Sequence, residues 1–453
     1  MRDHNAWRDQ PHRAEDHGPG QRTNEHGLTF HGAARTMAEI AAFRCREAHG
    51  ICPAVNESKP LQVIVVGGSM AGLCAGLVLR AGGCAVEVFE KSPGEMQERG
   101  AGLVVQKEVL DFVVEHCGVR ADDLGVRSHT RQLLDRAGSV IWSEDSAQLM
   151  TSWDSLYRHL KRAFPGQHYH HACRLVTIRQ DGAQAHATFE DGREFACDLL
   201  VCADGANSTA RRLLLPDLAA RYAGYVAWRG MIVERELAKS ARDLMAEKFT
   251  FFHTTHTQML SYFVPGPVGE TAPGQRRINW VWYWNVPEGE PLREILTGSD
   301  GQIHDFSVPQ GAVQPTLRLR QRAIAADVLP QMFQYLFDAT ALPFIQPIYD
   351  LSAPRMAFGR VCLMGDAAFV PRPHPAASTY KGVMNAIGLG KSLSLNAHDV
   401  TAALRDWEPA QLELGENLAR LGQEQGNRSQ FSTSGGADVI KLVARAMRPP
   451  SSP

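Results

Sequence analysis

The chain has 453 residues, of which 44% are hydrophobic and 21% charged, so it is an ordinary globular sequence that is longer than one core usually holds. Its formal net charge of −2 excludes the bulk positive field that recruits nucleic acid or anionic membranes. No apolar run reaches the roughly 18 residues of a membrane helix, no signal peptide is visible, and nine cysteines are scattered without a CxxC pair. These features predict two domains with reduced thiols in a cytoplasmic protein.

Residues 1–58 contain almost nothing to bury and are expected to form a disordered extension. The alternative is metal binding by the histidines of this segment, which are His4, His12, His17, His26 and His31. No two of these share a helical or fixed ligand spacing, so the disordered extension is favoured.

Residues 61–92, LQVIVVGGSMAGLCAGLVLRAGGCAVEVFEKS, predict a buried strand, a glycine turn, a helix and a second strand. The turn is made of Gly67, Gly68, Ser69, Met70, Ala71 and Gly72. It fits a dinucleotide fingerprint in which Ser69 replaces the second glycine. Glu90 ends the second strand, where an acid can accept hydrogen bonds from ribose hydroxyls. The alternative is a structural βαβ unit that binds no nucleotide.

Arg99 lies in a flexible glycine loop, and the residues after it, QKEVLDFVVEHC, predict an amphipathic helix that Gly118 ends. Gln106 stands near the helix start. It can reach a bound cofactor or, equally, satisfy backbone groups at the helix end.

Residues 128–150 and 222–350 carry alternating strands rich in aromatic residues and predict an antiparallel sheet in a second domain. Within it, NWVWYWNV is expected to pack in the core rather than to bind substrate. Between the two parts, a helix is expected at SWDSLYRHLKRAF, and a buried strand ends at Asp204. Asp204 either caps the next helix or helps to seat a dinucleotide.

A third buried strand, GRVCLM, ends in the turn Gly365-Asp366, and three prolines follow at positions 371, 373 and 375. A helix capped by Ser378 or Thr379 is expected next, and a largely helical segment over 405–448. Glycine or aspartate turns therefore end three buried strands, and the second domain is inserted between them.

This ordered set resembles the single-component FAD-dependent aromatic hydroxylases, the group containing para-hydroxybenzoate hydroxylase, over about residues 61–410. Four segments are most similar to hydroxypyridine hydroxylases: TSWDSLYRHL, YAGYVAWRGM, NWVWYWNV and GDAAFVPRPHPAAS. The resemblance implies an α/β fold in which a Rossmann-like FAD-binding domain carries an inserted antiparallel β-sheet substrate domain. The FAD-binding domain would comprise residues 59–127, 151–221 and 351–404, the substrate domain residues 128–150 and 222–350, and the C-terminal helix and tail residues 405–453.

The resemblance also implies the reaction. NAD(P)H reduces FAD, O2 adds to give a C4a-hydroperoxide, and an electrophilic oxygen is delivered to a hydroxylated aromatic ring, expected to be a hydroxypyridine. The choice between NADH and NADPH stays open. A small aromatic substrate and O2 are the expected partners, with no nucleic acid and no membrane, and a homodimer is possible.

By the same resemblance, the cofactor contacts come from separate places in the sequence. The ADP half would be bound by Gly67, Gly68, Ser69, Met70, Ala71, Gly72, Glu90 and Lys91. Arg99 and Gln106 would lie near the pyrophosphate and ribityl chain, and Asp204 would help to seat the dinucleotide. Asp366 beside Gly365 would bind the ribityl hydroxyls. Residues 371–379, with Ala376, Ala377 and Ser378, would line the flavin ring.

His374 is the leading candidate to orient or deprotonate the substrate, because histidine titrates near neutrality. Pro371 and Tyr262 complete the predicted catalytic set, and Tyr225 and His253 are weaker candidates. For each aromatic or histidine, the alternative is a satisfied residue on a half-buried strand.

Three residues depart from the pattern of the resembled group: Ser378 stands where glycine is expected, Tyr380 where a small residue suits, and Asn385 where an acid is expected. A flavin-dependent halogenase would need a GWxWxIP-type segment, which the chain lacks. Two alternatives stay open: an FAD oxidase or dehydrogenase without oxygen transfer, and a catalytically silent flavin-binding module.

Overall fold

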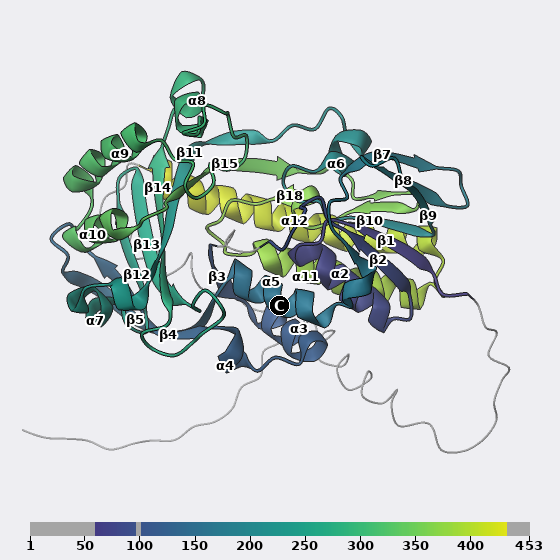
Figure 1. Ribbon diagram of the computed structural model, residues 1–453, viewed down its shortest axis with the longest axis horizontal. Helices are drawn as coiled ribbons and strands as arrows, with labels where there is room; N and C mark the ends of the chain where they lie inside the picture. The colour runs from purple at the N-terminus through teal and green to yellow at the C-terminus, as the bar shows by residue number, and fades with distance from the viewer. Residues whose placement is uncertain (1–58, 97–100, 433–453) are drawn as a thin grey trace, which may run out of the picture. The chain divides into compact units, whose positions relative to one another are not determined.

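The computed structural model describes residues 59–96 and 101–432. The predictions for the N-terminal histidines and for Arg99 fall outside these residues. The described part is built on a six-stranded sheet and a nine-stranded sheet, with a smaller three-stranded sheet beside the first (Figure 1).

The six-stranded sheet is parallel except at one edge, where β16 pairs antiparallel with β17. In spatial order its strands are β16 (Ala357–Phe358), β17 (Val361–Leu363), β10 (Leu199–Cys202), β1 (Gln62–Val66), β2 (Ala85–Phe89) and β6 (Tyr169–His170). Its central strands are short apolar runs buried on both faces, as a parallel sheet covered on both sides requires.

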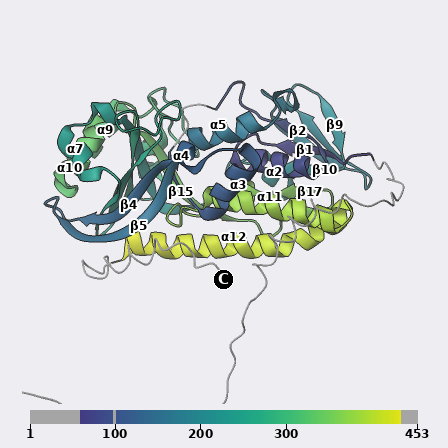
Figure 2. The same ribbon diagram turned by 90° about the horizontal axis from the view of Figure 1, so that it is seen from below.

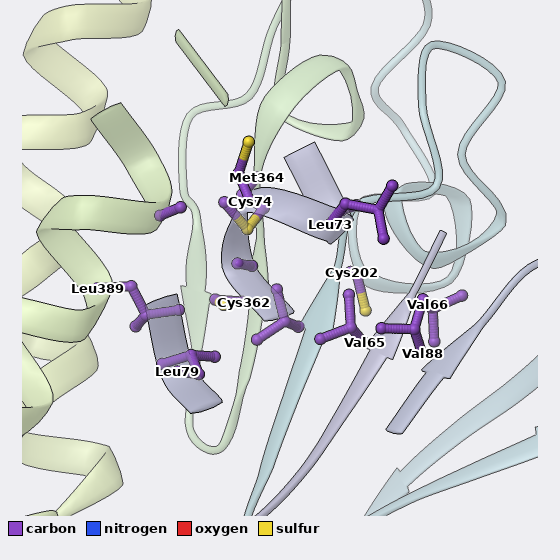
Figure 3. Packing of buried hydrophobic residues seen from close by; sticks show 14 of the residues in the cluster. Val65, Val66, Leu73, Cys74, Leu79, Val88, Cys202, Cys362, Met364 and Leu389 are labelled. Atoms are coloured by element: carbon purple, nitrogen blue, oxygen red, sulfur yellow. The ribbon is translucent and has the colours of Figure 1, made fainter. Parts of the chain in front are cut away.

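Helices α2 (Met70–Ala81) and α11 (Ser378–Leu395) pack on this sheet and against each other. Figure 3 shows the core between them: Val65 and Cys202 on the strands face Leu73 and Leu79 of α2, and Leu389 comes from α11. The packing matters for function because it brings together the first and third turns, which are about 300 residues apart in the sequence.

The nine-stranded sheet forms the second layer. In spatial order its strands are β18 (Phe369–Val370), β15 (Phe344–Ser352), β11 (Arg221–Val233), β14 (Arg277–Asn285), β13 (Thr257–Val264), β12 (Lys248–Thr254), β4 (Val126–Leu134), β5 (Val140–Ser152) and β3 (Gly102–Val105).

Two details of this sheet differ from the sequence prediction. The pair β4–β12 is parallel, because these strands are joined through the other domain and not by a hairpin, which leaves their direction free. Two short strands from segments assigned to the FAD-binding domain, β3 and β18, pair instead with the long substrate-sheet strands β5 and β15. The two domains therefore share this sheet.

One face of the nine-stranded sheet is covered by α7 (Lys239–Met245), α8 (Glu290–Leu296), α9 (Pro315–Val328) and α10 (Gln331–Ala339) (Figure 1). Trp228, Trp280 and Trp282 are fully buried on this face around Phe337. Trp280 and Trp282 of NWVWYWNV are therefore core residues, as expected, and Trp284 is partly buried against the same cluster. Tyr283, between Trp282 and Trp284, points to the opposite face.

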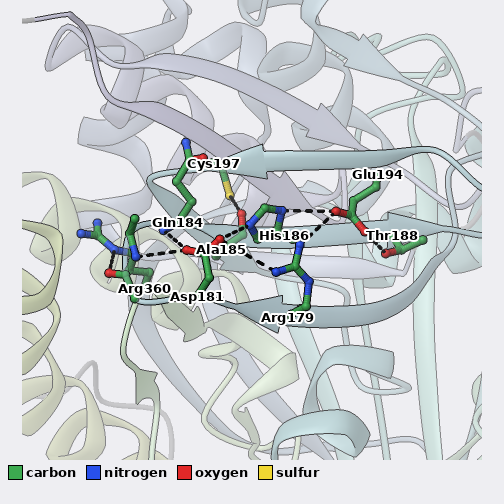
Figure 4. Close-up of polar contacts among 11 residues, drawn as sticks. Arg179, Asp181, Gln184, Ala185, His186, Thr188, Glu194, Cys197 and Arg360 are labelled. Atoms are coloured by element: carbon green, nitrogen blue, oxygen red, sulfur yellow. Dashed lines mark hydrogen bonds and ion pairs between the residues drawn. The ribbon is translucent and has the colours of Figure 1, made fainter.

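The three-stranded sheet consists of β7 (Leu175–Gln180), β8 (Ala185–Phe189) and β9 (Glu194–Cys197). His186 lies between two carboxylates on its surface, with Nε2 2.9 Å from Asp181 Oδ2 and Nδ1 3.3 Å from Glu194 Oε1 (Figure 4). Arg179 also contacts Glu194, so these pairs link neighbouring strands of the hairpins.

The long helix α12 (Val400–Phe431) runs beside α11 and on to the nine-stranded sheet (Figure 2). It begins five residues earlier than the predicted segment. The remaining helices are α3 (Lys107–Cys117), α4 (Ala121–Leu124), α5 (Trp153–Ala163) and α6 (Thr209–Leu214), with 3₁₀ turns η2 (Gly166–His168), η3 (Glu234–Glu236) and η4 (Gly365–Ala367). In the described ranges, none of the helices has the length and hydropathy to cross a membrane.

Candidate flavin and substrate site

The two glycines that begin the turn after β1 have no room for a side chain. Gly67 has a φ of +102°, and a Cβ on Gly68 would lie 2.2 Å from the Tyr169 hydroxyl. That hydroxyl donates a 2.9 Å hydrogen bond to the Gly68 carbonyl and so fixes the turn from β6. The turn therefore depends on glycine both for its conformation and for the close approach of Tyr169.

Glu90 is buried at the end of β2 and holds this turn. Its Oε2 accepts a 2.8 Å hydrogen bond from the Gly68 N–H, and its Oε1 accepts one of 2.9 Å from the Ser92 N–H. A carboxylate has about four acceptor positions, so Glu90 keeps capacity for ribose hydroxyls while it shapes the turn.

A cavity of about 200 Å³ opens over the carboxyl ends of β1, β2 and β10. Five of the predicted cofactor residues line it together: Gly67, Ser69, Glu90, Lys91 and Asp204. Ligands of open α/β sheets bind at this edge of the strands. The sequence prediction did not include Trp153 and Arg174, which complete the wall of the cavity.

Asp204 caps a helix, which was one of the two roles predicted for it. Its Oδ2 accepts hydrogen bonds from the N–H groups of Thr209 and Ala210 at 2.7 and 3.1 Å, and its Oδ1 accepts one of 2.5 Å from the Ser208 hydroxyl. The carboxylate therefore caps the start of α6 and also borders the cavity, so the two roles are compatible.

The turn Gly365-Asp366 follows β17 and contacts the first turn. Gly365 has a φ of +62°, and a Cβ there would lie 2.6 Å from the Cβ of Ala71. Asp366 Oδ1 accepts hydrogen bonds from the Ser378 hydroxyl at 3.2 Å and from the buried Lys381 ammonium at 2.7 Å. Asp366 itself is partly exposed, in contrast to Lys381.

Two of the departures from the resembled pattern have structural explanations. Asn385 Oδ1 accepts a 2.9 Å hydrogen bond from the Gly365 N–H, and its Nδ2 donates one of 2.9 Å to Gln411 on α12. An amide offers both an acceptor and a donor, which a carboxylate does not. Ser378 does not cap α11, because the cap position is Ala377 and has no side-chain hydrogen bond; its hydroxyl is bound to Asp366 instead.

The proline-rich loop is fastened by Arg372. The guanidinium is buried and donates to Asp350 on β15, to Oδ1 at 2.9 Å and to Oδ2 at 2.8 Å, and it donates to Asn427 on α12 at 2.8 Å. Gly422 and Gly426 face it from α12, and a Cβ on either would come within 3.0 Å of Arg372. The loop is therefore held to both the substrate sheet and α12.

Gln106 and Ala376 lie together on one side of this loop. The Gln106 Nε2 donates a hydrogen bond to the Ala376 carbonyl. Ala376 has a φ of +54°, a strained conformation for a residue with a Cβ. The Gln106 Oε1 is buried and has no partner among the residues that the structure describes. An orphaned acceptor beside a strained loop is typical of a site that awaits a ligand donor.

His374 reaches from the loop to the substrate sheet. Its Nε2 lies 2.9 Å from the Tyr225 hydroxyl, and its ring centroid lies 4.7 Å from that of Tyr283. Burial above all, then Arg372 and His253, lower the pKa of His374 to about 3. Burial also raises the pKa of Tyr225. Both groups are therefore neutral at pH 7.

The other predicted catalytic residues are placed differently. Tyr262 is buried on β13, where its ring packs edge-on against Phe249. The Nε2 of His253 on β12 donates a 3.1 Å hydrogen bond to the Ser429 carbonyl of α12, and its Nδ1 has no partner among the described residues. Pro371 is partly buried at the start of the loop. Tyr225, ranked below Tyr262 from the sequence, is the tyrosine that contacts His374.

The geometry and the hydrogen-bonding groups of these residues suit FAD. The glycine turn and its cavity suit a dinucleotide. Among the described residues the Gln106 Oε1 lacks a donor, which a ribityl hydroxyl would offer, and the partly exposed Asp366 carboxylate is a second acceptor. Among the described residues, no group of three or more His, Cys, Asp or Glu side chains could hold a metal ion.

The fold and site define the class of FAD-dependent monooxygenases that hydroxylate aromatic substrates, and the chain belongs to this family. A family model described as FAD binding domain-like matches residues 222–350. A relative from Paenarthrobacter nicotinovorans, 2,6-dihydroxypyridine 3-monooxygenase, is 34% identical over 374 residues, which cover 82% of this chain and 92% of the relative.

Solved structures agree. The structure of 2,6-dihydroxypyridine-3-hydroxylase from Arthrobacter nicotinovorans matches with a TM-score of 0.78 and 32% identity, covering 83% of this chain and 94% of that one. Klebsiella pneumoniae HpxO complexed with FAD and uric acid shares the fold, with a TM-score of 0.67 and 20% identity, covering 85% and 91%. FAD is therefore the cofactor, with NAD(P)H as the reductant.

Proposed function

We propose that the protein hydroxylates a hydroxypyridine and that the predicted residues above bind FAD. The observation that carries the proposal is the neutral His374–Tyr225 pair on the proline-rich loop, set against the substrate sheet. The similarity to a dihydroxypyridine monooxygenase over most of both chains supports the substrate class.

In this proposal FAD, reduced by NAD(P)H, supplies the activated oxygen from O2. The glycine turn and Glu90 hold the ADP half, with Lys91 beside them, and Gln106 and Asp366 hold the ribityl chain. Residues 371–378 form a stiff wall, because proline restricts φ and the Arg372–Asp350 pair fixes the loop.

The chain also contributes to substrate orientation and to water exclusion. A histidine with a pKa of about 3 is a weak base at pH 7, so His374 orients the ring hydroxyl through hydrogen bonds and does not remove its proton. Tyr225 holds the His374 ring in place. The apolar side chains around Tyr225 and Tyr283 keep water from the reactive oxygen.

The test is a screen of hydroxypyridines and simple phenols for stimulated NAD(P)H oxidation, with the mass of the product. A ring-hydroxylated hydroxypyridine supports the proposal. Stoichiometric peroxide with unchanged ligand indicates an FAD oxidase, an oxidised ligand without added oxygen indicates a dehydrogenase, and a yellow protein with no stimulated oxidation indicates a silent flavin-binding module. The cytoplasmic location and the homodimer stay predictions from the sequence.

Two variants test the site assignment. Asp366→Ala is expected to give colourless protein, whereas Asp366→Asn, which retains an acceptor for Lys381, should keep part of the flavin. His374→Ala should bind FAD but release more peroxide per NAD(P)H consumed. A fully flavinated Asp366→Ala protein, or a fully coupled His374→Ala protein, contradicts the corresponding role.

A further inference from the structure

A second cavity, of about 700 Å³, lies between helix α5 and the substrate domain. Its volume is in the range of about 300–1,000 Å³ that is usual for ligand pockets. One wall is α5 itself. The opposite wall comes from the end of β11, from residues 267–268 and from the connection between α10 and β15. Both domains therefore contribute to this space, the α5 cavity.

The wall formed by α5 is positively charged. Arg158, Lys161 and Arg162 line the cavity and lie three and four residues apart, so they share one face of the helix. Lys161 is 3.7 Å from Glu95, and Arg158 donates a 2.8 Å hydrogen bond to the Pro267 carbonyl. Within the described residues, neither Arg158 nor Arg162 has a carboxylate oxygen within 4.0 Å. Both arginines are therefore available to an anionic ligand.

The carboxylates in the lining do not neutralise this wall. Asp154 is paired with the buried Arg277 at 3.0 Å, and Glu95 accepts a 3.1 Å hydrogen bond from the Tyr157 hydroxyl. The third carboxylate, Glu236, comes from the opposite wall and forms no ion pair with a described residue. With four cations against three carboxylates, the lining keeps a positive charge.

The opposite wall is largely apolar. Met231 and Val233 of β11 belong to it, together with Val268 and Leu342. Val268 is 74% exposed and Leu342 54%, although both border a cavity. Exposed apolar side chains beside a cavity are typical of a surface that binds a planar ring. A ligand that suits both walls therefore combines a planar base with an anionic group.

The α5 cavity adjoins the cofactor site. Met96 lines both this cavity and the one at the glycine turn. Met231 lies on the same face of β11 as Tyr225, which is the face toward the proline-rich loop. A ligand in the α5 cavity therefore lies between the turn that is proposed to bind FAD and the substrate sheet.

The reductant needs a site of its own. Only one segment of the sequence, residues 67–72, fits a dinucleotide fingerprint, and the proposed function gives it to FAD. NAD(P)H carries an anionic pyrophosphate between two planar bases. Cations on α5 can bind the pyrophosphate through charge-assisted hydrogen bonds, and the apolar wall can contact a base. The α5 cavity matches the reductant in both respects.

We infer that the α5 cavity is the docking site of NAD(P)H, in which Arg158, Lys161 and Arg162 bind the pyrophosphate and the apolar wall contacts a base. The inference deepens the proposed function and rests on it for the place of FAD. The pyrophosphate is common to NADH and NADPH, so both coenzymes should depend on these cations.

Nucleotide binding to the FAD-loaded protein tests the assignment without turnover. The probes in calorimetry are NAD+, NADP+ and ADP-ribose, which keeps the pyrophosphate but lacks nicotinamide, and adenosine is the control without phosphate. We expect added salt to raise the Kd of the three charged probes and not that of adenosine. Anaerobic reduction of the flavin by NAD(P)H gives a second Kd and a limiting rate.

Four variants separate the charge from the cavity. Arg162→Glu reverses an exposed cation and should raise the Kd of the charged probes at least tenfold, with the Kd of adenosine and the limiting rate unchanged. Arg162→Lys keeps the charge and should lose less affinity. Ala341→Trp fills the cavity from an exposed position without a change of charge and should weaken all four probes. Arg405→Gln, on α12, should match the wild type.

Unchanged Kd values in Arg162→Glu and Ala341→Trp would overturn the assignment. So would an effect of Arg162→Glu without one of Ala341→Trp, which marks a general field of α5. A loss confined to NADP+ contradicts the pyrophosphate contact, and loss of FAD absorption in Ala341→Trp shows that the cavity serves FAD. If Arg162→Glu fails to fold, Ala341→Trp decides. If no hydroxypyridine is hydroxylated yet nucleotide binding follows these residues, the substrate proposal fails and the docking site stands.

Discussion

Arg372 and Asp350 form a two-fold hydrogen-bonded ion pair between the flavin-lining loop and strand β15, with Nε–Oδ1 at 2.9 Å and Nη2–Oδ2 at 2.8 Å. Both side chains are less than a tenth exposed. The pair joins a loop of the cofactor domain to the substrate sheet, so the position of the flavin wall depends on the sheet.

Removal of either partner of the Arg372–Asp350 pair should lower the free energy of unfolding. Asp350→Asn leaves a buried guanidinium without its anion, so the free energy of unfolding should fall by about 3–5 kcal/mol. The loosened loop should also raise the peroxide released per NAD(P)H. Chemical denaturation and a peroxide assay measure the two effects. The exposed pair Arg320–Glu294 is the matched control, and Glu294→Gln should change stability by less than about 1 kcal/mol. Equal effects in the two variants would refute the role of the buried pair.

The glycine turn should not tolerate a methyl group. Gly68→Ala places a Cβ 2.2 Å from the Tyr169 hydroxyl, so either the turn or Tyr169 must move. We expect the purified variant to lose most of its FAD, as read from its visible absorption. Gly166→Ala, whose added Cβ meets nothing within 4 Å, is the control and should stay fully flavinated. Normal FAD content in Gly68→Ala would mean that the glycine turn accommodates the methyl group, which contradicts the prediction.

Stability should depend on pH through His374. Its pKa is about 3 in the folded protein against an ordinary value of 6.5, so between these values the unfolded chain binds the additional proton. The contribution is therefore fully present above pH 6.5 and is lost as the pH falls toward 3. Between pH 7.5 and pH 5, it amounts to at most about 2 kcal/mol.

Urea unfolding of the wild type and of His374→Gln at both pH values isolates this contribution, because the other titrating groups are common to both proteins. The wild type should lose more stability than the variant on going to pH 5. Identical losses would show that His374 is protonated in the folded protein.

The last turn of α12 should keep water out of the substrate site. The Ser429 carbonyl contacts His253, the Gln430 carbonyl accepts from Asn285 at 2.8 Å, and the Phe431 ring lies 6.1 Å from that of Tyr225. A chain ended after Arg428 should still bind FAD but release more peroxide during NAD(P)H oxidation. A chain ended after Ser432 keeps these contacts and serves as the control. If both truncations couple oxidation equally well, this turn does not protect the site.

The sequence by itself determined the FAD-type layer. Strands β1, β10 and β17 are short apolar runs ended by glycine or aspartate turns, and both signals are local: apolar runs follow from burial, and glycine from a backbone conformation that other residues avoid. The same locality explains the errors. Strands β3 and β18 are too short to carry a pattern, and the direction of β4 against β12 depends on a connection through another domain.

Only the tertiary structure decided which polar groups meet. His374 and Tyr225 are 149 residues apart in the sequence, and Arg372 of the proline-rich loop pairs with Asp350 on β15. No local pattern marks Tyr225 over Tyr262 as the partner of His374. Charge compensation and hydrogen bonding act over a few ångströms in space, so they are settled when distant segments pack and not before.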